Sequence, residues 1–411
     1  VALGCDFFDS SAYIKYANDE RLIFPDGTVK LQDIKEMSCH CPVCSKYNIS
    51  EFNKLKKSDR VREIAKHNLY ISFSEIKKIR NAIHNSSLWE LVERRANSNP
   101  YLLEALKILR TKENKEWLEK NETVSKKSAV FYTGQNTIHR PIIHRVHKKL
   151  ISNYDKDIKD IIVFPEDVKP YSVSYKEEIN DVLRKNPNVS LLVDSALGPV
   201  PMELDEMYPF AQSVFPKFTD SETEEFATSI FEKFTKDKNI ICWTGKETLD
   251  QIKDSNKKEF DMDLKRISSV CDIQFKKGSW RVLLDGNVKI VKSKKTGKIR
   301  NIYCNDKHVL SMRAEDGMFT LKIEGAKILH NNFKKPFLRI VIEDDAVPFV
   351  KDGKSVFNKF VKDCDPNLRP LDECLIVDSK DNLLAVGRSL LNRGEMLSFN
   401  YGTSAKNRET I

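Results

Sequence analysis

The run Cys39-His-Cys-Pro-Val-Cys44, followed by His67, decides more about this sequence than any other stretch. Three thiolates and one imidazole are the donor set of a tetrahedral zinc site, and soft sulfur ligands favour zinc over hard cations such as magnesium. Four protein ligands leave no coordination position for water, so the pattern predicts one structural zinc ion. Arg62–His67 is expected to be helical and to present the imidazole, whereas His40 is a rival ligand that a tight loop disfavours. The alternative is a cluster of free thiols beside a core histidine.

The composition indicates several domains and an anionic partner. The chain has 411 residues, with 69 lysines and arginines against 60 acidic residues, a net charge of +9 and a pI near 8.9. This length predicts about two to four domains, and the charge favours nucleic acid or a membrane surface. Because no apolar run could span a bilayer and no signal-like segment is seen, we expect a soluble protein with no membrane partner. Nine cysteines, three of them crowded into the metal motif, indicate a reducing, cytoplasmic compartment.

The opening residues are apolar where a chain terminus is usually polar. Val1–Phe8 is expected to be a buried strand, and it begins with Val1 rather than methionine. Either a GTG start codon was read literally or residues upstream are missing, and we expect the latter. Asp9 would lie at the end of this strand. Asp6, three residues earlier, would face the opposite side and is expected to be structural.

Four segments follow one another along the chain. The first is predicted to contain helices at Ser74–Ile83 and from the capping box Ser87-Leu-Trp-Glu90, and it ends in a lysine-rich stretch. The second should contain buried strands at Ile161–Phe164 and Ser190–Val193. The third should begin with a helix, and the fourth alternates short β runs with turns, as in a small barrel. The expected boundaries are 1–125, 126–250, 251–332 and 333–411.

Two local patterns predict how the second and third segments fold. The capping box Ser221-Glu-Thr-Glu224 should begin a helix whose stripe Phe226, Ile230, Phe231 and Phe234 packs into the core. Val288–Val291 and Ile299–Tyr303 flank a Thr296-Gly297 turn, which predicts a β-hairpin.

The metal motif and several further runs resemble the tRNA-guanine transglycosylases. A Cys-x-Cys-x-x-Cys with a histidine about two dozen residues later is similar to the zinc pattern of that family. The segment Gly4-Cys-Asp-Phe-Phe-Asp9 resembles the strand end that carries its nucleophile, and the last segment is similar to a PUA domain, a small RNA-binding barrel. Further runs that look like the archaeosine branch or its PUA tail are His67-Asn-Leu-Tyr70, Leu88-Trp-Glu-Leu-Val-Glu-Arg-Arg95, Arg140-Pro141, Gly198-Pro-Val-Pro-Met-Glu-Leu-Asp-Glu-Met-Tyr-Pro209, Gly353-Lys-Ser-Val-Phe357 and Leu383-Leu-Ala-Val-Gly-Arg388.

The resemblance implies a fold class of α/β and α+β modules in one multidomain chain. Residues 1–125 would be the C-terminal remnant of a TIM-type (β/α)₈ catalytic barrel with its zinc subdomain. Residues 126–250 and 251–332 would be two small α+β domains, and 333–411 the PUA barrel. A whole barrel needs roughly 250 residues, so the resemblance also implies an N-terminal barrel half as a partner. It further implies that the complete protein is a homodimer.

The resemblance implies an exchange of bases in tRNA. The guanine at position 15 of the D-loop would be replaced by the free base preQ0, 7-cyano-7-deazaguanine, in archaeosine biosynthesis. Asp9 would attack C1′ of the ribose to form a covalent aspartyl-ribosyl intermediate, which the incoming base then resolves. Read without the resemblance, Asp9 is an ordinary strand-end or N-cap aspartate. The base pocket and the proton-handling carboxylate would lie upstream, so we expect the chain alone to be inactive.

Basic residues in the last two segments are candidate RNA contacts. The target guanine must be unstacked to reach a pocket, which suits long RNA-binding appendages. The lysines of the predicted hairpin could contact phosphates, or they could form an ordinary solvated hairpin tip. In the tail, Lys354 and Arg388 match PUA positions near the RNA face, whereas Phe357 is expected in the core. The candidates are Lys289, Lys292, Lys294, Lys295, Lys298, Arg300, Lys354 and Arg388.

Two other functions remain open. The chain could be a non-catalytic tRNA-binding subunit or one half of a split transglycosylase. It could also resemble the related archaeosine synthase, whose hallmark includes a Pro-Cys pair before Lys-Pro-Tyr and a following histidine. Lys169-Pro-Tyr171 is present here, but Pro165 is followed by Glu166 and no histidine follows nearby. These differences from the synthase hallmark favour a transglycosylase over a synthase.

Overall fold

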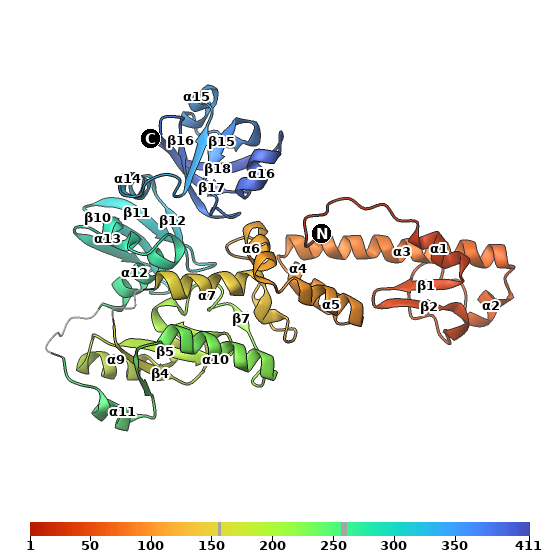
Figure 1. Cartoon of the computed structure of the whole chain (residues 1–411), viewed down its shortest axis with the longest axis horizontal. Helices are drawn as coiled ribbons and strands as arrows, with labels where there is room; N and C mark the ends of the chain where they lie inside the picture. The colour runs from red at the N-terminus through yellow and green to blue at the C-terminus, as the bar shows by residue number, and fades with distance from the viewer. Residues whose placement is uncertain (155–157, 256–260) are drawn as a thin grey trace. The chain divides into compact units, whose positions relative to one another are not determined.

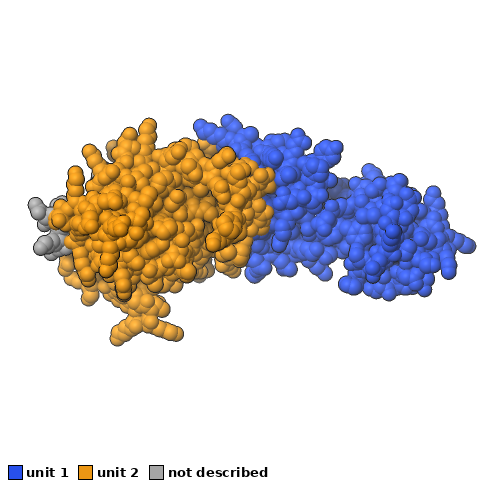
Figure 2. Space-filling view, turned by 90° about the horizontal axis from the view of Figure 1, so that it is seen from below, with its two compact units in different colours: residues 1–114 blue, residues 115–411 orange. Residues whose placement is uncertain are grey.

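The computed structural model describes residues 1–154, 158–255 and 261–411, and it divides into two compact units (Figures 1 and 2). Unit 1 comprises Val1–Asn114 and unit 2 comprises Lys115–Ile411. No helix in the described ranges combines the length and the apolar character that a membrane crossing requires.

Unit 1 has a small hydrophobic core to which one long helix contributes. After an irregular opening segment come α1 (Ala12–Asn18), the antiparallel hairpin of β1 (Arg21–Phe24) and β2 (Gly27–Lys30), and a 3-10 turn at Leu31–Asp33. Ala17, Leu22, Leu31, Phe52 and Ile64 form the centre of its core. The helices that follow are α2 (Ile49–Lys54), α3 (Lys57–His84), α4 (Leu88–Ala96) and α5 (Pro100–Ile108), and α6 (Lys112–Asn121) leads into unit 2.

The predicted strand at Val1–Phe8 is wrong. Residues 1–11 have no regular secondary structure, and Phe7 and Phe8 are 94% and 62% exposed. A strand needs a neighbour to accept its backbone hydrogen bonds. Among the described residues of unit 1, β1 and β2 pair only with each other, so no strand pairs with this apolar segment.

Helix α3 extends beyond both predicted pieces. Arg62–His67 and Ser74–Ile83 belong to one helix of 28 residues, which confirms both as helical. Helix α4 also begins where predicted, but the Ser87 side chain makes no capping hydrogen bond. The Ser87 backbone N–H instead donates to the Ala82 carbonyl at 2.7 Å, because the chain turns back tightly between α3 and α4.

The first part of unit 2 is an α/β layer. Its sheet has the strand order β6-β5-β4-β8, with β4 (Asp160–Phe164) parallel to both β5 (Ser190–Ser195) and β8 (Asn239–Cys242), and β6 (Gly198–Pro201) antiparallel to β5. The two predicted buried strands are therefore confirmed. The helices are α7 (Pro141–Asn153), α8 (Tyr171–Ser174), α9 (Lys176–Lys185), α10 (Ser221–Thr235) and α11 (Lys246–Gln251), and β3 (Val130–Phe131) pairs with β7 (Ser213–Val214).

Helix α10 buries the predicted apolar stripe. Ile230 and Phe234 are buried, and Phe226 and Phe231 pack partly buried against the same core. The N-cap is Asp220 rather than Ser221, because the Asp220 carboxylate accepts a hydrogen bond from the Thr223 backbone at 3.0 Å.

An antiparallel sheet forms the next part of unit 2. Helices α12 (Met262–Gln274) and α13 (Ser279–Leu283) precede strands in the order β12-β11-β10-β9, and α14 (Ile323–Asn332) follows them. β9 (Val288–Lys292) and β10 (Ile299–Cys304) form the predicted hairpin, and Gly297 in its turn has φ +70°. The other strands are β11 (Lys307–Met312) and β12 (Phe319–Leu321).

The C-terminal part is a curled six-stranded sheet in the order β14-β18-β17-β16-β13-β15. Its edge strands, β14 (Val356–Phe357) and β15 (Val361–Cys364), do not pair with each other in the described chain, so the predicted barrel is only half closed. One continuous hydrophobic core joins all parts of unit 2, from Val124 to Ala405. The remaining elements are β13 (Arg339–Ile342), α15 (Val347–Lys351), β16 (Glu373–Val377), β17 (Leu383–Ser389), α16 (Arg393–Ser398) and β18 (Thr403–Thr410).

Candidate metal centre and nucleic-acid interface

The four predicted metal ligands meet in unit 1. One ligand atom from each of Cys39, Cys41, Cys44 and His67 lies within 4.8 Å of all the others. The cysteines come from the loop before α2, and His67 comes from the first half of α3. The Nδ1 atom of His67 lies 3.5 Å from the Cys41 sulfur and 3.2 Å from the Cys44 sulfur. His40 is exposed and lies outside the cluster.

A hydrogen bond orients the His67 ring. Its Nε2 lies 2.9 Å from the Ile23 carbonyl on β1, an acceptor, so Nε2 carries the hydrogen and Nδ1 turns its lone pair towards the sulfurs. The next residue, Asn68, also holds α3 against β1, because its side chain accepts from the Ile23 N–H at 2.7 Å and donates to the carbonyls of Tyr13 and Arg21. No local sequence pattern predicts these orienting contacts, because they join residues that lie 44 to 55 positions apart.

Without a cation, the thiols of the cluster hold their protons. Burial raises the pKa of Cys44, and the neighbouring Cys41 raises it further. Burial also raises the pKa of Cys39, and burial lowers the pKa of His67 although its bond to Ile23 opposes this. Three thiolates could coexist in this space only with a cation to offset their charge, because metal binding and thiol deprotonation are coupled.

The geometry fits a tetrahedral ion. Zinc bonds of about 2.3 Å to sulfur and about 2.1 Å to nitrogen place neighbouring sulfur and nitrogen ligands about 3.5 Å apart. The two measured separations, 3.5 Å and 3.2 Å, are close to that value. The cluster can therefore hold a metal ion such as zinc with four protein ligands.

Asp9 lies in the irregular segment before α1 and is exposed. Asp6 is exposed in the same segment. Because no strand forms there, the expected distinction between an outward Asp6 and a strand-end Asp9 does not hold in this structure.

The basic hairpin is only partly engaged in ion pairs. Lys292 pairs with Asp263, and Lys298 lies 3.4 Å from Glu206. Lys294 and Lys295, in the turn, are exposed, as are Lys289 and Arg300 on the strands.

The two tail residues expected at the RNA face, Lys354 and Arg388, differ in exposure. Lys354 is exposed and directly follows Gly353, whose φ is +82°. Phe357, expected in the core, is 48% exposed, so that prediction is wrong. Alternation along the edge strand β14 explains it, since Val356 turns inward at 2% exposure and its neighbour must turn outward.

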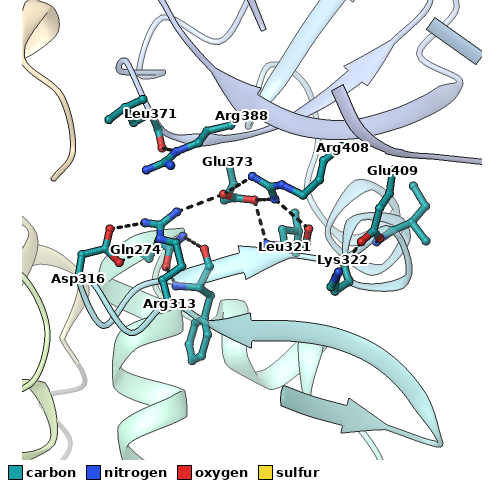
Figure 3. A network of polar contacts seen from close by, with 12 residues as sticks. Gln274, Arg313, Asp316, Leu321, Lys322, Leu371, Glu373, Arg388, Arg408 and Glu409 are labelled. Atoms are coloured by element: carbon teal, nitrogen blue, oxygen red, sulfur yellow. Dashed lines mark hydrogen bonds and ion pairs between the residues drawn. The ribbon is translucent and has the colours of Figure 1, made fainter. Parts of the chain in front are cut away.

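Arg388 is partly buried and lies among a group of polar contacts (Figure 3). Its Nε donates to the Leu371 carbonyl at 3.1 Å. Burial lowers the pKa of Arg388, and the nearby charge of Arg313 lowers it further. This position does not favour the predicted RNA contact.

Glu373 is the centre of that network and is 2% exposed. It accepts from Arg313 at 3.3 Å, from both terminal nitrogens of Arg408 at 2.6 and 3.1 Å, and from the Leu321 backbone at 2.9 Å. Arg313 also pairs with Asp316 at 2.9 Å. The network thus joins the sheet of β9–β12 to the C-terminal sheet through one buried carboxylate.

Three family models match parts of the chain. Residues 1–101 match the queuine tRNA-ribosyltransferase family, residues 265–336 match the patch-forming domain C2 of tRNA-guanine transglycosylase, and residues 338–411 match the PUA domain. The last of these is the curled C-terminal sheet.

The chain is also similar over its whole length to curated archaeal proteins named tRNA-guanine(15) transglycosylase. It is 39% identical to the protein of Methanothermobacter thermautotrophicus, 38% to that of Methanosphaera stadtmanae and 39% to that of Methanobrevibacter smithii. Each match covers 100% of this chain and 63%, 64% and 64% of the respective relative. The chain therefore spans somewhat less than two thirds of the length of these relatives.

Proposed function

The chain belongs to the family of archaeal tRNA-guanine(15) transglycosylases, and from this membership we propose that it takes part in exchanging guanine 15 of tRNA for preQ0. The observation that carries the proposal is 38–39% identity along the entire chain to three such enzymes. The Cys₃His cluster and the PUA module support it, because both agree with the same family.

The proposed nucleophile is Asp9. One carboxylate oxygen attacks C1′ of the ribose, and the bond from C1′ to the guanine nitrogen breaks as the base leaves with the bonding electrons. The ring nitrogen of preQ0 then attacks C1′ and releases the carboxylate, so one glycosidic bond replaces another and no ATP is needed. The exposure of Asp9 leaves its carboxylate accessible to a ribose. No residue of this chain is assigned to proton transfer or to binding of the base.

The proposed role of the metal is structural. Cys39, Cys41, Cys44 and His67 would hold one zinc ion, which would fasten the cysteine loop to α3 and, through the His67–Ile23 hydrogen bond, to β1. With four protein ligands the ion would have no open position, so no step of the exchange passes through it.

The proposed tRNA-binding region is residues 251–411. Lys294 and Lys295 in the hairpin turn and Lys354 in the tail are exposed and would contact phosphates. We also propose that the four modules correspond to residues 1–125, 126–250, 251–332 and 333–411, with the first contributing to the catalytic domain.

The experiment that tests the function is incorporation of labelled preQ0 into a tRNA transcript. The 411-residue chain is assayed together with the N-terminal barrel half of the Methanothermobacter relative, in trans or fused ahead of Val1. We expect incorporation with this pair, and none when guanine 15 of the transcript is replaced by adenine. Binding of tRNA without any incorporation would instead support a non-catalytic binding subunit.

A further inference from the structure

A cleft of about 360 Å³ lies between the end of α6 and the C-terminal sheet in unit 2. Trp117, Lys120 and Asn121 of α6 form one wall, and Arg369, Arg393 and Glu395 of the C-terminal module form the other. None of these residues belongs to the metal cluster, the basic hairpin or the loop of Lys354.

The two walls are fastened together by hydrogen bonds. The Asn392 side chain donates to the Asn121 side-chain oxygen at 2.9 Å, and the Val124 N–H donates to the Pro370 carbonyl at 3.1 Å. The guanidinium of Arg145 on α7 also holds the end of α6, because it donates to the carbonyls of Glu119, Glu122 and Thr123. The cleft is thus formed in advance and need not be assembled by a ligand.

The cleft is lined by a buried cation, Arg369, with one unused hydrogen-bond donor among the described residues. Arg369 is 8% exposed, and its Nη1 donates to the carbonyls of Pro366 and Leu368 at 3.0 and 3.2 Å. Among the described residues, its Nε is buried without a hydrogen-bond partner. The charges of Glu119, Asp372 and Asp365 favour its charged form, but burial and the neighbouring charge of Arg145 outweigh them and lower the pKa of Arg369. A guanidinium remains charged in proteins, and a buried charged donor that makes no hydrogen bond is costly. An anion entering the cleft would offset that cost.

The other lining residues add two further cations, one carboxylate and an aromatic ring. Lys120 is exposed, and Arg393 already shares its charge with Asp363, which accepts from the Arg393 Nε at 3.0 Å. Glu395, the acidic lining residue, caps α16 by accepting from the Asn392 N–H at 2.9 Å. Trp117, one helical turn before Lys120, is 46% exposed in spite of its large apolar ring. An exposed indole beside cations is the combination by which proteins bind single-stranded nucleic acid.

We propose that this cleft binds one nucleotide from an unpaired stretch of tRNA, with its base against Trp117 and its phosphate at Arg369 and Lys120. The inference rests on the proposed function for the identity of the partner. The volume suits a ligand of nucleotide size, since small-molecule sites have volumes of about 300–1,000 Å³. The site adds a base-stacking contact to the phosphate contacts of the hairpin and tail.

The test is the affinity of the full chain for a tRNA transcript, measured by fluorescence anisotropy over a range of salt concentrations. Trp117→Ala should weaken binding on the order of tenfold and leave the salt dependence unchanged, because it removes stacking but no charge. Lys120→Glu should weaken binding and also reduce the steepness of the salt dependence by about one phosphate contact or more. Both side chains are exposed, so neither variant should alter the thermal unfolding of the chain.

Matched controls are available away from the cleft. Phe218→Ala removes an aromatic side chain that is 80% exposed, and Lys233→Glu reverses an exposed charge on α10. Neither should change the affinity as much as its counterpart in the cleft. If the wild-type chain binds tRNA and the two cleft variants bind as tightly, the cleft proposal is overturned while the proposed function stands. If the wild-type chain does not bind tRNA at all, both proposals fail.

Discussion

At the scale of single residues, His67 connects the metal cluster to the rest of unit 1. One ring nitrogen faces the sulfurs of Cys41 and Cys44, and the other is held by the Ile23 carbonyl. A hydrogen bond to the far nitrogen of a metal-binding histidine fixes both the tautomer and the direction of its ring. Loss of the metal should therefore affect the packing of α3 on β1 as well as the cysteine loop.

The first prediction concerns Cys41→Ser, which replaces a soft thiolate with a weak ligand. We expect the purified variant to contain much less than one zinc per chain, and its unit 1 to unfold at a temperature lower by about 5 °C or more, because metal binding and folding are coupled. Elemental analysis and thermal unfolding followed by circular dichroism would measure the two effects.

The matched control is Cys5→Ser. Cys5 is an exposed cysteine outside the cluster, so its replacement should alter neither zinc content nor stability. A Cys41→Ser protein with full zinc and unchanged unfolding would show that the cluster is not the metal site.

Among the secondary-structure elements, those set by contacts between neighbouring residues could be predicted from the sequence. Those that depend on a partner far along the chain could not. The hairpin of β9 and β10 was predicted because its own turn sets the pairing. The cysteine spacing likewise predicted the cluster. Val1–Phe8 was predicted as a strand from its apolar residues, but a strand also requires a neighbour, and none is present in unit 1 as described. The hydrogen bond between Ile23 and Asn68 could not be predicted, because the two residues lie 45 positions apart.

The second prediction concerns the hairpin turn. Replacing Lys294, Lys295 and Lys298 with alanine should reduce the salt dependence of tRNA binding by about two to three phosphate contacts, with Lys298 contributing least because it already lies near Glu206. The control replaces three other exposed lysines with alanine and so removes the same charge elsewhere. Lys233 lies in α10, Lys236 directly follows that helix, and Lys246 lies in α11. If the two triple variants have the same salt dependence, the hairpin is an ordinary solvated tip.

The third prediction concerns the contact between α6 and α7. Burial alone would raise the pKa of Glu119, but the hydrogen bond with His144 and the charges of Arg145 and Lys148 outweigh it and lower the pKa to about 2. The unfolded value is about 4.3, so ionised Glu119 stabilises the fold above that pH. This contribution should disappear as the pH falls from about 4.3 to about 2.

Glu119→Gln should therefore lower the unfolding temperature at pH 7, and its deficit relative to wild type should shrink as the pH falls towards 2. Glu116→Gln, which changes an exposed residue of the same helix, should follow the wild-type profile. Thermal unfolding across this pH range is the measurement. A deficit that stays constant with pH would mean that the charge of Glu119 does not matter.

At the scale of the whole molecule, the buried network around Glu373 makes the last two sheets of unit 2 one body (Figure 3). Arg313 and Leu321 come from the region of β11 and β12, and Arg408 comes from β18. The modules that match domain C2 and the PUA domain should therefore keep a fixed mutual orientation.

The fourth prediction tests this coupling. Glu373→Gln removes the buried counter-charge of Arg408 and one of the two carboxylate partners of Arg313, which keeps Asp316, and should lower the free energy of unfolding by about 3 kcal/mol. Glu343→Gln, which removes a half-exposed partner of Lys362, should cost about 1 kcal/mol or less. Denaturant unfolding of the two variants compares them directly. An equal, small effect would mean that the network does not hold the modules together.

The central claim is that Asp9 becomes covalently joined to tRNA during exchange. The direct measurement is a denaturing gel of the chain incubated with labelled tRNA and the N-terminal barrel half of a relative, without preQ0 and then with it. We expect a protein–tRNA adduct that disappears on adding preQ0, is absent in Asp9→Asn and persists in Asp6→Asn. An adduct that still forms in Asp9→Asn, or exchange by that variant, would contradict the claim.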